Sequence, residues 1–521
     1  MSVGLDAAAS MAVLFAGGAL PVLAGVGLRW PALVLAPLAG SVLAAVGAMA
    51  TLAVGGNPLG WFVGLSVLGA AASLGWWTLS GRWPGLAGPR GRHAAAPVPS
   101  SPAGLRWGGA LAALASITAA VVWSLRALRV PRVGFDARAI YLLHAQWFAA
   151  GHQVALSTLR SPSLIFSQQT YPPLSSAAVA VSWLVVGGRS LRLGVVVIAL
   201  LNACAVAAAA WVVAEVGRRA ADRVLVVRTG TRPGPAWAWA LVPLAVGVVA
   251  AGLVALAAFG AAGDGAVDGY ADLLWSAAAI GAVGFGLTLS GQGSDLAAAV
   301  VLVGVAGLTK SDGIPPAMAV VALMALRAAW RAWHRAPGRV PWRPLVAGAA
   351  GIVALGAWPV EVRLLRATAI GAGTHPGSAS SRIHQTLSGV APYLHALELA
   401  VPVALVGWLL AGRARRTIPL GNDLLAWAVV AVYAGCLFFV YVTTNGSVAL
   451  RLATSVTRTT VFLQLAGWYL LGVWAVVGAT APGLTVAERP AAAPPTPAPT
   501  GADPEPAVEA GQGSEAVASR R

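Results

Sequence analysis

The chain has 521 residues, of which 58% are hydrophobic and 10% are charged, and its mean hydropathy is +0.77. Because each membrane crossing needs ~20 mostly apolar residues, this composition excludes a water-soluble globular protein and predicts a polytopic membrane protein. The formal net charge is +17, but the arginines gather in short segments between apolar stretches. That distribution is typical of cytoplasmic loops, so the charge indicates orientation in the membrane and predicts no nucleic-acid partner.

Apolar segments recur along most of the chain. We expect each of them to form a helix, because lipid offers no hydrogen-bond partner to an exposed backbone group. The candidate spans are 9–28, 32–54, 58–80, 108–128, 193–214, 237–259, 273–290, 296–309, 313–328, 345–362, 393–411, 424–441 and 461–480. The sequence therefore predicts an all-α, polytopic transmembrane helical bundle of about 13 spans.

The arginine-rich segments set the expected orientation. Segments 81–107, 217–235, 327–343 and 413–416 are expected to be cytoplasmic under the positive-inside rule. The outer segments are then the N-terminus, 131–192, 260–272, the residues around 310, 363–392 and 442–460. Segment 171–188 is apolar too, but counting it as a crossing would place 217–235 outside. We therefore interpret 171–188 as re-entrant or interfacial.

Composition divides the chain into three parts. Residues 1–107 hold three additional N-terminal spans and a basic loop, and residues 108–482 form the remaining transmembrane core. No positive segment precedes the first apolar run, so we expect a retained first span rather than a cleaved signal peptide. Residues 483–521 are rich in Pro, Ala, Gly and Glu without apolar periodicity, which predicts a disordered cytoplasmic tail.

The longest outer segment begins with an acidic residue. Asp136 precedes a stretch, 137–150, in which apolar residues recur at helical spacing. The apolar positions are Ile140, Leu143, Trp147 and Phe148, and the polar residues off that stripe are Arg138, His144 and Gln146. The pattern predicts an amphipathic helix lying on the membrane surface. Asp136 fits two roles, a cap at the helix N-terminus or a general base at the mouth of a cavity.

A second acidic segment, GDGAVDGYADLLW, places Asp264, Asp268, Tyr270 and Asp272 ahead of an apolar run. If the stretch is helical, Asp268 and Asp272 share one face. Carboxylates that enter a span are costly unless they serve a purpose. Binding a divalent cation through oxygen ligands is one such purpose. The alternative is that they stay solvated at the loop end, which we expect of Asp264.

Lys310 is the only lysine in the chain and lies between two apolar runs, in VAGLTKSDG. A lysine presents a compact charge on a thin stem, which suits contact with a phosphate in a narrow polar cavity. The alternative is a structural lysine that snorkels to an interface or pairs with Asp312. The last outer segment carries Ser455 and Arg458, and an arginine on the outer side indicates an anionic partner.

These motifs occur in a recognisable order, FDARAIYLLHAQWF, QQTYPPLSSAAV, DGYADLLW, GLTKSDG and ATSVTRTTVFLQL. The order and spacing resemble uncharacterised bacterial members of the GT-C superfamily of membrane glycosyltransferases. The resemblance covers about 131–465, and each motif is weak by itself. The three spans before residue 81 are not part of the common pattern. The chain also departs from it where Ala137 and Arg138 follow Asp136, because the usual second acidic residue is missing there.

The resemblance implies transfer of a sugar from a polyprenyl-phosphate donor to a glycan, lipid or protein acceptor of the cell envelope, on the outer face of the plasma membrane. Asp136 would then be the general base of an inverting reaction, and Lys310 and Arg458 would bind the donor phosphate. The substrate-binding residues that it implies are Tyr171, Asp268, Tyr270, Asp272, Asp312 and Ser455. A divalent cation is a less favoured use of the carboxylates, and no cofactor is predicted with certainty.

A second hypothesis is a secondary transporter or lipid flippase in which Lys310, Asp312 and Asp272 form an intramembrane ion or proton site. A third is a catalytically silent relative with a scaffold role. Geometry separates the first two. A transferase needs Asp136 and Lys310 in one cavity open to the outer leaflet, whereas a transporter needs its charges buried near the middle of the membrane.

Overall fold

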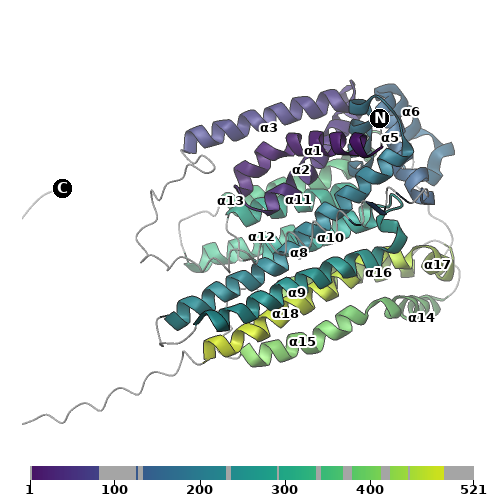
Figure 1. The fold of residues 1–521 in the computed structure, drawn as a ribbon. Helices are drawn as coiled ribbons and strands as arrows, with labels where there is room; N and C mark the ends of the chain where they lie inside the picture. Colours follow the sequence, from purple (N-terminus) through teal and green to yellow (C-terminus); the bar gives the residue numbers. More distant parts are fainter. Residues whose placement is uncertain are drawn as a thin grey trace, which may run out of the picture.

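A computed structural model describes most of the chain. The described residues are 3–80, 133–229, 236–289, 293–335, 342–367, 378–411, 423–443 and 446–485, with Val122, Leu125, Arg126 and Arg129 between them. All regular structure in these residues is helical, which confirms the all-α prediction. The predicted span 108–128 lies almost wholly outside the described residues, as does the predicted tail from residue 486 onward. Figure 1 shows the long helices running side by side in one bundle.

Nine helices in the described part of the chain are long and apolar enough to cross a membrane. They are α1 (Val3–Val26), α2 (Pro31–Val54), α3 (Pro58–Ser80), α8 (Leu191–Thr229), α9 (Ala236–Ala262), α12 (Ile314–Arg335), α13 (Trp342–Leu364), α16 (Asp423–Thr443) and α18 (Val461–Thr485). A tenth candidate joins α14 (Ala379–Val390) to α15 (His395–Ala411) across a bend of 70°. The chain is therefore a multi-pass membrane protein by the length and apolarity of its helices.

Three further apolar helices are shorter than a full crossing. They are α7 (Leu174–Val186), α10 (Asp272–Val283), which continues as a π-helical turn to Thr288, and α11 (Gly293–Thr309). The predicted spans 273–290 and 296–309 correspond to α10 and α11, so two of the expected 13 spans are short helices. Helix α7 corresponds to 171–188 and has only 13 residues. It is buried against α1, α2, α5 and α8 and is too short for a full crossing.

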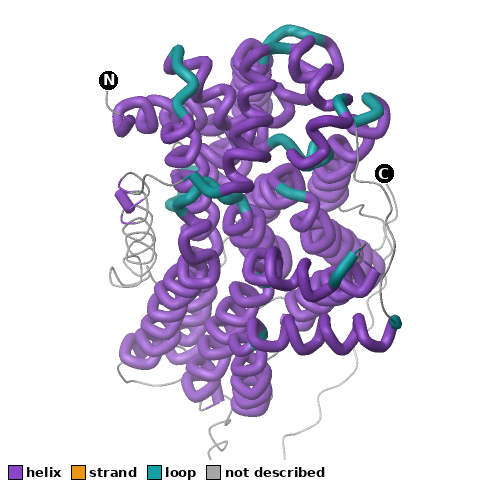
Figure 2. Tube along the Cα trace, turned by 90° about the vertical axis from the view of Figure 1, so that its right-hand side faces the viewer, coloured by secondary structure: helices purple, strands orange, loops and turns teal. Residues whose placement is uncertain are grey.

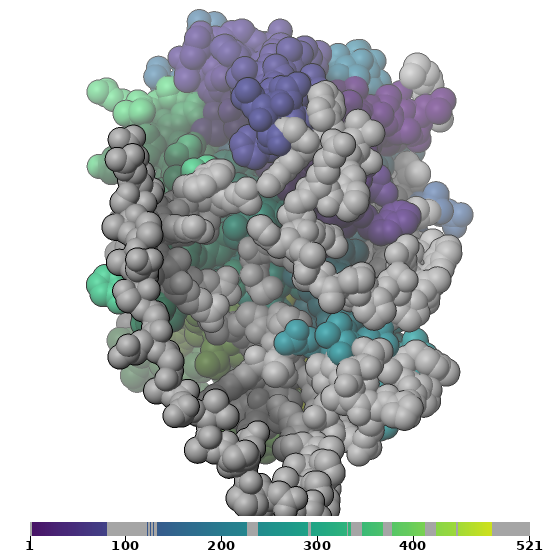
Figure 3. All heavy atoms as spheres, turned by 90° about the vertical axis from the view of Figure 1, so that its left-hand side faces the viewer, coloured from purple at the N-terminus to yellow at the C-terminus, as the bar shows by residue number. Residues whose placement is uncertain are grey.

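Small residues allow the N-terminal helices to approach closely. A Cβ atom on Gly40 of α2 would lie 1.9 Å from the carbonyl oxygen of Leu14 in α1. Glycine is therefore required at this contact, as is common where membrane helices pack through their backbones. Helices α1 to α3 form one flank of the molecule, which is purple in Figure 3, and pack against α7, α8 and α11.

The two ends of the bundle differ. Helices α5 (Leu143–Ala150), α6 (His152–Arg160), α14 and α17 (Val448–Thr459) gather at one end, which we call the amphipathic end and which faces the viewer in Figure 2. The C-terminal ends of α3 and α8 lie at the other end, which we call the arginine end (Figure 1). Both of these helices run into arginine-rich segments of the sequence, 81–107 and 217–235. The two segments were predicted to lie on the same side of the membrane, and the helices that lead into them do end on the same side of the bundle.

The predicted helix 137–150 is present, but it is not a surface helix of regular spacing. Its first part, Ala137–Leu142, is a π-helix, and α5 follows directly. A π-helix has more residues per turn than an α-helix, so the side chains no longer follow the 3.6-residue period on which the prediction rested. Tyr141 and His144 consequently point inward, with 2% and 3% of their surfaces exposed. The prediction that His144 lies on the polar side was wrong.

Burial of His144 makes the amphipathic end sensitive to acid. The His144 ring stacks on Trp147, with 4.4 Å between the ring centres. Burial lowers the pKa of His144 from 6.5 to about 4, although a hydrogen bond with the backbone of Ser167 opposes this shift. The unfolded chain therefore binds this proton between pH 6.5 and 4 while the folded chain does not. Stability is retained above pH 6.5 and falls as the pH drops through this window, by roughly 3 kcal/mol at pH 4.

The measurement is the melting temperature in detergent between pH 7.5 and 4.5. We expect it to fall more steeply for the wild type than for His144→Phe, which keeps the aromatic contact with Trp147 but cannot be protonated. Parallel curves for the two proteins would show that His144 does not control the acid response.

Candidate functional site

Lys310 lies at the amphipathic end, in the break between α11 and α12. Its backbone is extended, with φ −156° and ψ 149°, and a single 3-10 turn, Ser311–Gly313, leads into α12. The break brings the lysine Nζ within 2.6 Å of Asp272 Oδ1 and 2.9 Å of Asp312 Oδ2. The side chains of Lys310 and Asp272 are 7% and 5% exposed, and that of Asp312 is 35% exposed. The structural pairing with Asp312 is thus present, but the closer partner is the buried Asp272.

Asp272 is the first residue of α10, where a carboxylate is favoured by the helix dipole. The predicted face shared by Asp268 and Asp272 does not exist, because α10 begins at Asp272 and Asp268 lies in the preceding turn. The carbonyl oxygen of Asp268 accepts a hydrogen bond from the backbone N–H of Gly134 at 3.0 Å. Asp268 therefore joins its own turn to the segment that precedes Asp136. Asp264 is 78% exposed, as expected for a solvated position.

Asp136 forms an ion pair with Arg458, a residue 322 positions away. Asp136 has helical dihedral angles and its side chain makes no capping hydrogen bond, so it does not serve as a helix cap. The two side chains are 26% and 30% exposed, which leaves the pair accessible from the amphipathic end. The cap role considered for Asp136 is therefore wrong, and its side chain instead faces Arg458.

Arg458 is positioned by α17. The hydroxyl oxygen of Ser447 accepts a hydrogen bond from the N–H of Leu450 at 3.3 Å and caps the helix, and apolar side chains four residues apart are buried. Arg458 falls in the last turn, where a cation is favoured by the helix dipole. Its guanidinium carbon lies 5.3 Å from the centre of the Tyr270 ring, a distance at which a cation–π interaction forms.

The two ion pairs belong to one electrostatic unit. Burial by itself lowers the pKa of Arg458, but the negative charge of Asp272 and the hydrogen bond and charge of Asp136 outweigh it, so the pKa is raised above its ordinary value. Burial and the charge of Asp136 raise the pKa of the Tyr270 phenol. Asp272 therefore acts on both Lys310 and Arg458, and Tyr270 stays protonated as a hydrogen-bond donor at neutral pH.

Close packing of two loops brings Asp136 and Tyr270 together. A Cβ atom on Gly134 would lie 2.1 Å from Cε2 of Tyr270. Gly269 has a φ of +89°, and a Cβ atom there would lie 3.0 Å from Cβ of Ala137. Larger residues at either position would push the two loops apart, so both glycines are needed for the geometry of the site.

Aromatic side chains surround Lys310. Nζ lies 5.8 Å from the centre of the Tyr171 ring, and the residue before Tyr171 is fixed by a 2.8 Å hydrogen bond from Trp358 Nε1 to the carbonyl oxygen of Thr170. Tyr141 and Tyr433 are also close enough to interact electrostatically with Lys310 and Asp272. The sequence analysis did not identify these two tyrosines. Tyr433 lies within an apolar span, and the inward position of Tyr141 depends on a π-helix that was not predicted.

Ser455 occupies a supporting position. Its hydroxyl donates to the carbonyl oxygen of Arg451 at 2.8 Å and lies 2.9 Å from the hydroxyl of Tyr441 in α16. Ser455 therefore links α16 to α17, the helix that carries Arg458. Apart from this residue and Asp268, the predicted site residues converge on the two ion pairs.

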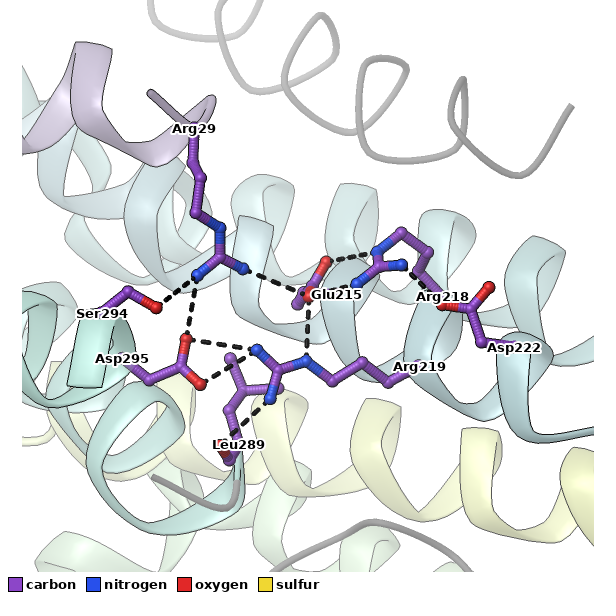
Figure 4. Close-up of polar contacts among 8 residues, drawn as sticks. All are labelled: Arg29, Glu215, Arg218, Arg219, Asp222, Leu289, Ser294 and Asp295. Atoms are coloured by element: carbon purple, nitrogen blue, oxygen red, sulfur yellow. Dashed lines mark hydrogen bonds and ion pairs between the residues drawn. The ribbon is translucent and has the colours of Figure 1, made fainter. Parts of the chain in front are cut away.

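A second ionic cluster lies at the arginine end, and sequence reasoning missed it (Figure 4). It contains Arg29, Glu215, Arg218, Arg219, Asp222 and Asp295, with three carboxylates and three arginines. Asp295 is fully buried and binds Arg29 at 3.2 Å and Arg219 at 2.9 Å. Asp295, at the start of α11, is thus joined to the turn before α2 and to α8.

Among the described residues, no group of three His, Cys, Asp or Glu side chains is placed to hold a metal ion. The acidic residues at the amphipathic end are instead arranged around Lys310 and Arg458. Comparison with family models, with characterised proteins and with solved structures finds no match to this chain. The function must therefore be argued from the site itself.

Proposed function

We propose that the protein is a membrane glycosyltransferase that transfers a sugar from a polyprenyl-phosphate donor to a cell-envelope acceptor on the outer face of the plasma membrane. One observation carries the proposal. Asp136 and Arg458 pair next to Lys310 and Asp272, at one end of the bundle, although these residues come from distant parts of the sequence. A carboxylate close to cations that can bind the donor phosphate is what an inverting transfer from a lipid phosphate requires.

The reaction assigns a role to each group. Asp136 accepts the proton of the acceptor hydroxyl while its oxygen forms a bond to the anomeric carbon of the sugar. The bond between that carbon and the phosphate oxygen breaks, and polyprenyl phosphate leaves with the electron pair. Negative charge grows on the phosphate in the transition state, so Lys310 and Arg458 accelerate the step more than they tighten ground-state binding.

Binding of the donor is expected to loosen the Asp136–Arg458 ion pair. When a phosphate binds Arg458, the guanidinium shares its charge between two anions, and Asp136 is released to act as a base. Tyr270 remains beside Arg458 in both arrangements and holds the guanidinium plane through its ring.

The place of the charges at one end of the bundle supports a transferase. Asp136, Arg458 and Asp312 are between 26% and 35% exposed at the amphipathic end, whereas Lys310 and Asp272 are buried beside them. An ion site of a transporter is expected near the middle of the membrane, away from such a surface. The arginine-rich segments join the opposite end, so the positive-inside rule orients the amphipathic end outward.

The direct test uses the purified protein in liposomes with externally added, radiolabelled polyprenyl-phosphate sugars carrying a hexose, a pentose or an amino sugar. Cell-envelope material from a strain that lacks the protein supplies the acceptor. We expect release of polyprenyl phosphate and label in the acceptor for at least one donor. Absence of both with every donor, from protein that is folded, would contradict the proposal. Movement of intact donor across the bilayer would support the flippase instead.

Lys310→Ala is expected to reduce donor use by about 10-fold or more, because a charge-assisted hydrogen bond to the phosphate is lost. The substitution also leaves Asp272 buried without its cation, which destabilises the fold by itself. Lys310→Ala combined with Asp272→Asn removes both charges and separates the two effects. We expect this double variant to regain stability but not donor use, as measured by melting temperature and by the donor KM. Recovery of donor use together with stability would assign Lys310 a purely structural role.

A further inference from the structure

The two ionic clusters of this protein differ in charge balance. At the arginine end, three carboxylates meet three arginines. Among the described residues of the amphipathic end, the three carboxylates of Asp136, Asp272 and Asp312 form ion pairs with two cations, Lys310 and Arg458. A donor phosphate would add a further negative charge to the second cluster. Because entry of the donor also expels water, this excess becomes costly unless the ligand brings a positive charge.

The clusters also differ in how completely their oxygens are bonded. In the described residues of the arginine end, the buried Glu215 and Asp295 accept hydrogen bonds on both carboxylate oxygens. Asp272 Oδ1 accepts from Lys310, whereas Asp272 Oδ2 is buried and accepts no hydrogen bond from the described chain. Buried carboxylate oxygens are normally hydrogen-bonded. Asp272 therefore offers a ready acceptor for a donor group of a ligand.

The unbonded oxygen belongs to the carboxylate that pairs with Lys310. Asp272 Oδ1 is 2.6 Å from Lys310 Nζ, so under the proposed function a sugar attached to a phosphate on Lys310 would lie near Asp272. The acceptor instead enters beside Asp136, which is more exposed than Asp272. The rings of Tyr171 and Tyr270 lie within 6 Å of the cations that are already present, and rings in such a position also attract a cationic ligand.

We propose that the sugar carried by the donor bears a protonated amine, which binds Asp272 through its unbonded oxygen, in the negative field of Asp272 and Asp312 and next to the lipid phosphate. This inference rests on the proposed glycosyltransferase function and names the class of sugar. The amine supplies the missing positive charge and donates a hydrogen bond to Asp272 Oδ2. A neutral hydroxyl at the same place donates a hydrogen bond but leaves the negative charge uncompensated.

The test compares three polyprenyl-phosphate donors that differ at one position of the sugar, which carries an amine, an N-acetyl group or a hydroxyl. The probe proteins are the wild type, Asp272→Asn and Asp264→Asn in liposomes. Asp264→Asn is the matched control, since it changes the same residue type in the same loop at an exposed position. We expect the wild type and Asp264→Asn to prefer the amine donor by about 10- to 100-fold in kcat/KM.

Two further measurements keep the inference testable if Asp272→Asn folds poorly. Raising the pH through the pKa of the amine, measured on the free donor, is expected to abolish the preference of the wild type for that donor. Asp312→Asn, at a more exposed position, is expected to weaken the preference by several-fold without preventing folding.

The outcomes separate the inference from the function on which it rests. Transfer of the amine and hydroxyl donors at equal rates would overturn the inference and leave the glycosyltransferase function intact. Efficient use of the hydroxyl donor only after Mg²⁺ is added would also overturn it, because a metal ion would then supply the missing charge. No transfer from any of the three donors by folded protein would overturn the proposed function and the inference with it.

Discussion

Asp136→Asn is expected to lower the rate of sugar transfer by about 10²- to 10⁴-fold, the usual contribution of a general base. Asparagine keeps the size of the side chain and still accepts a hydrogen bond from Arg458, so the loops should remain in place. It cannot accept the proton of the acceptor hydroxyl. The rate constant of a single turnover, measured with saturating donor and acceptor, reports this step without interference from product release.

Donor binding and folding serve as the controls for Asp136→Asn. Because the partly exposed Asp136–Arg458 pair contributes little to stability, we expect a melting temperature close to that of the wild type. Arg458 is released from a charged partner, so the affinity for the donor should be unchanged or higher. A single-turnover rate equal to that of the wild type would remove Asp136 from the mechanism. A rate that falls only in proportion to folded protein would make its role structural.

Asp295→Ala is expected to cause the largest loss of stability, about 3–5 kcal/mol. Asp295 is fully buried and binds both Arg29 and Arg219, so its removal leaves Glu215 to balance the charge of both arginines (Figure 4). The start of α11 loses its ion pairs with the turn before α2 and with α8. The melting temperature in detergent and the yield of folded protein measure the effect.

Two further variants serve as comparisons for Asp295→Ala. Asp222→Asn changes a carboxylate of the same cluster that is 36% exposed, and we expect it to cost less than about 1 kcal/mol. Asp295→Asn keeps some hydrogen bonds but removes the charge, and an intermediate loss is expected. Transfer per folded molecule should be unchanged in all three variants, because the cluster lies at the arginine end. A specific loss of transfer without loss of stability would show that the two ends of the bundle are coupled.

Composition and motif order were enough to predict the class of the protein and most of its candidate residues. Apolar length and the placement of arginine predicted a helical membrane protein, because the demands of lipid on the backbone depend on composition more than on detailed packing. Lys310, Asp136 and Arg458 were identifiable because a charged residue beside an apolar span is costly and therefore conspicuous. The resemblance to membrane glycosyltransferases rests on the same motifs, and its functional meaning is still a proposal.

Which of these residues contact one another depends on how the helices pack. Asp136 and Arg458 are 322 residues apart, and no local pattern predicts that pair or the role of Asp272 beside Lys310 and Arg458. The π-helix after Asp136 turned Tyr141 and His144 inward against the regular helical period. The ionic cluster around Asp295 could not be predicted from the sequence either. Helix packing brings its side chains together, and the distance along the chain between two helices does not predict whether they pack.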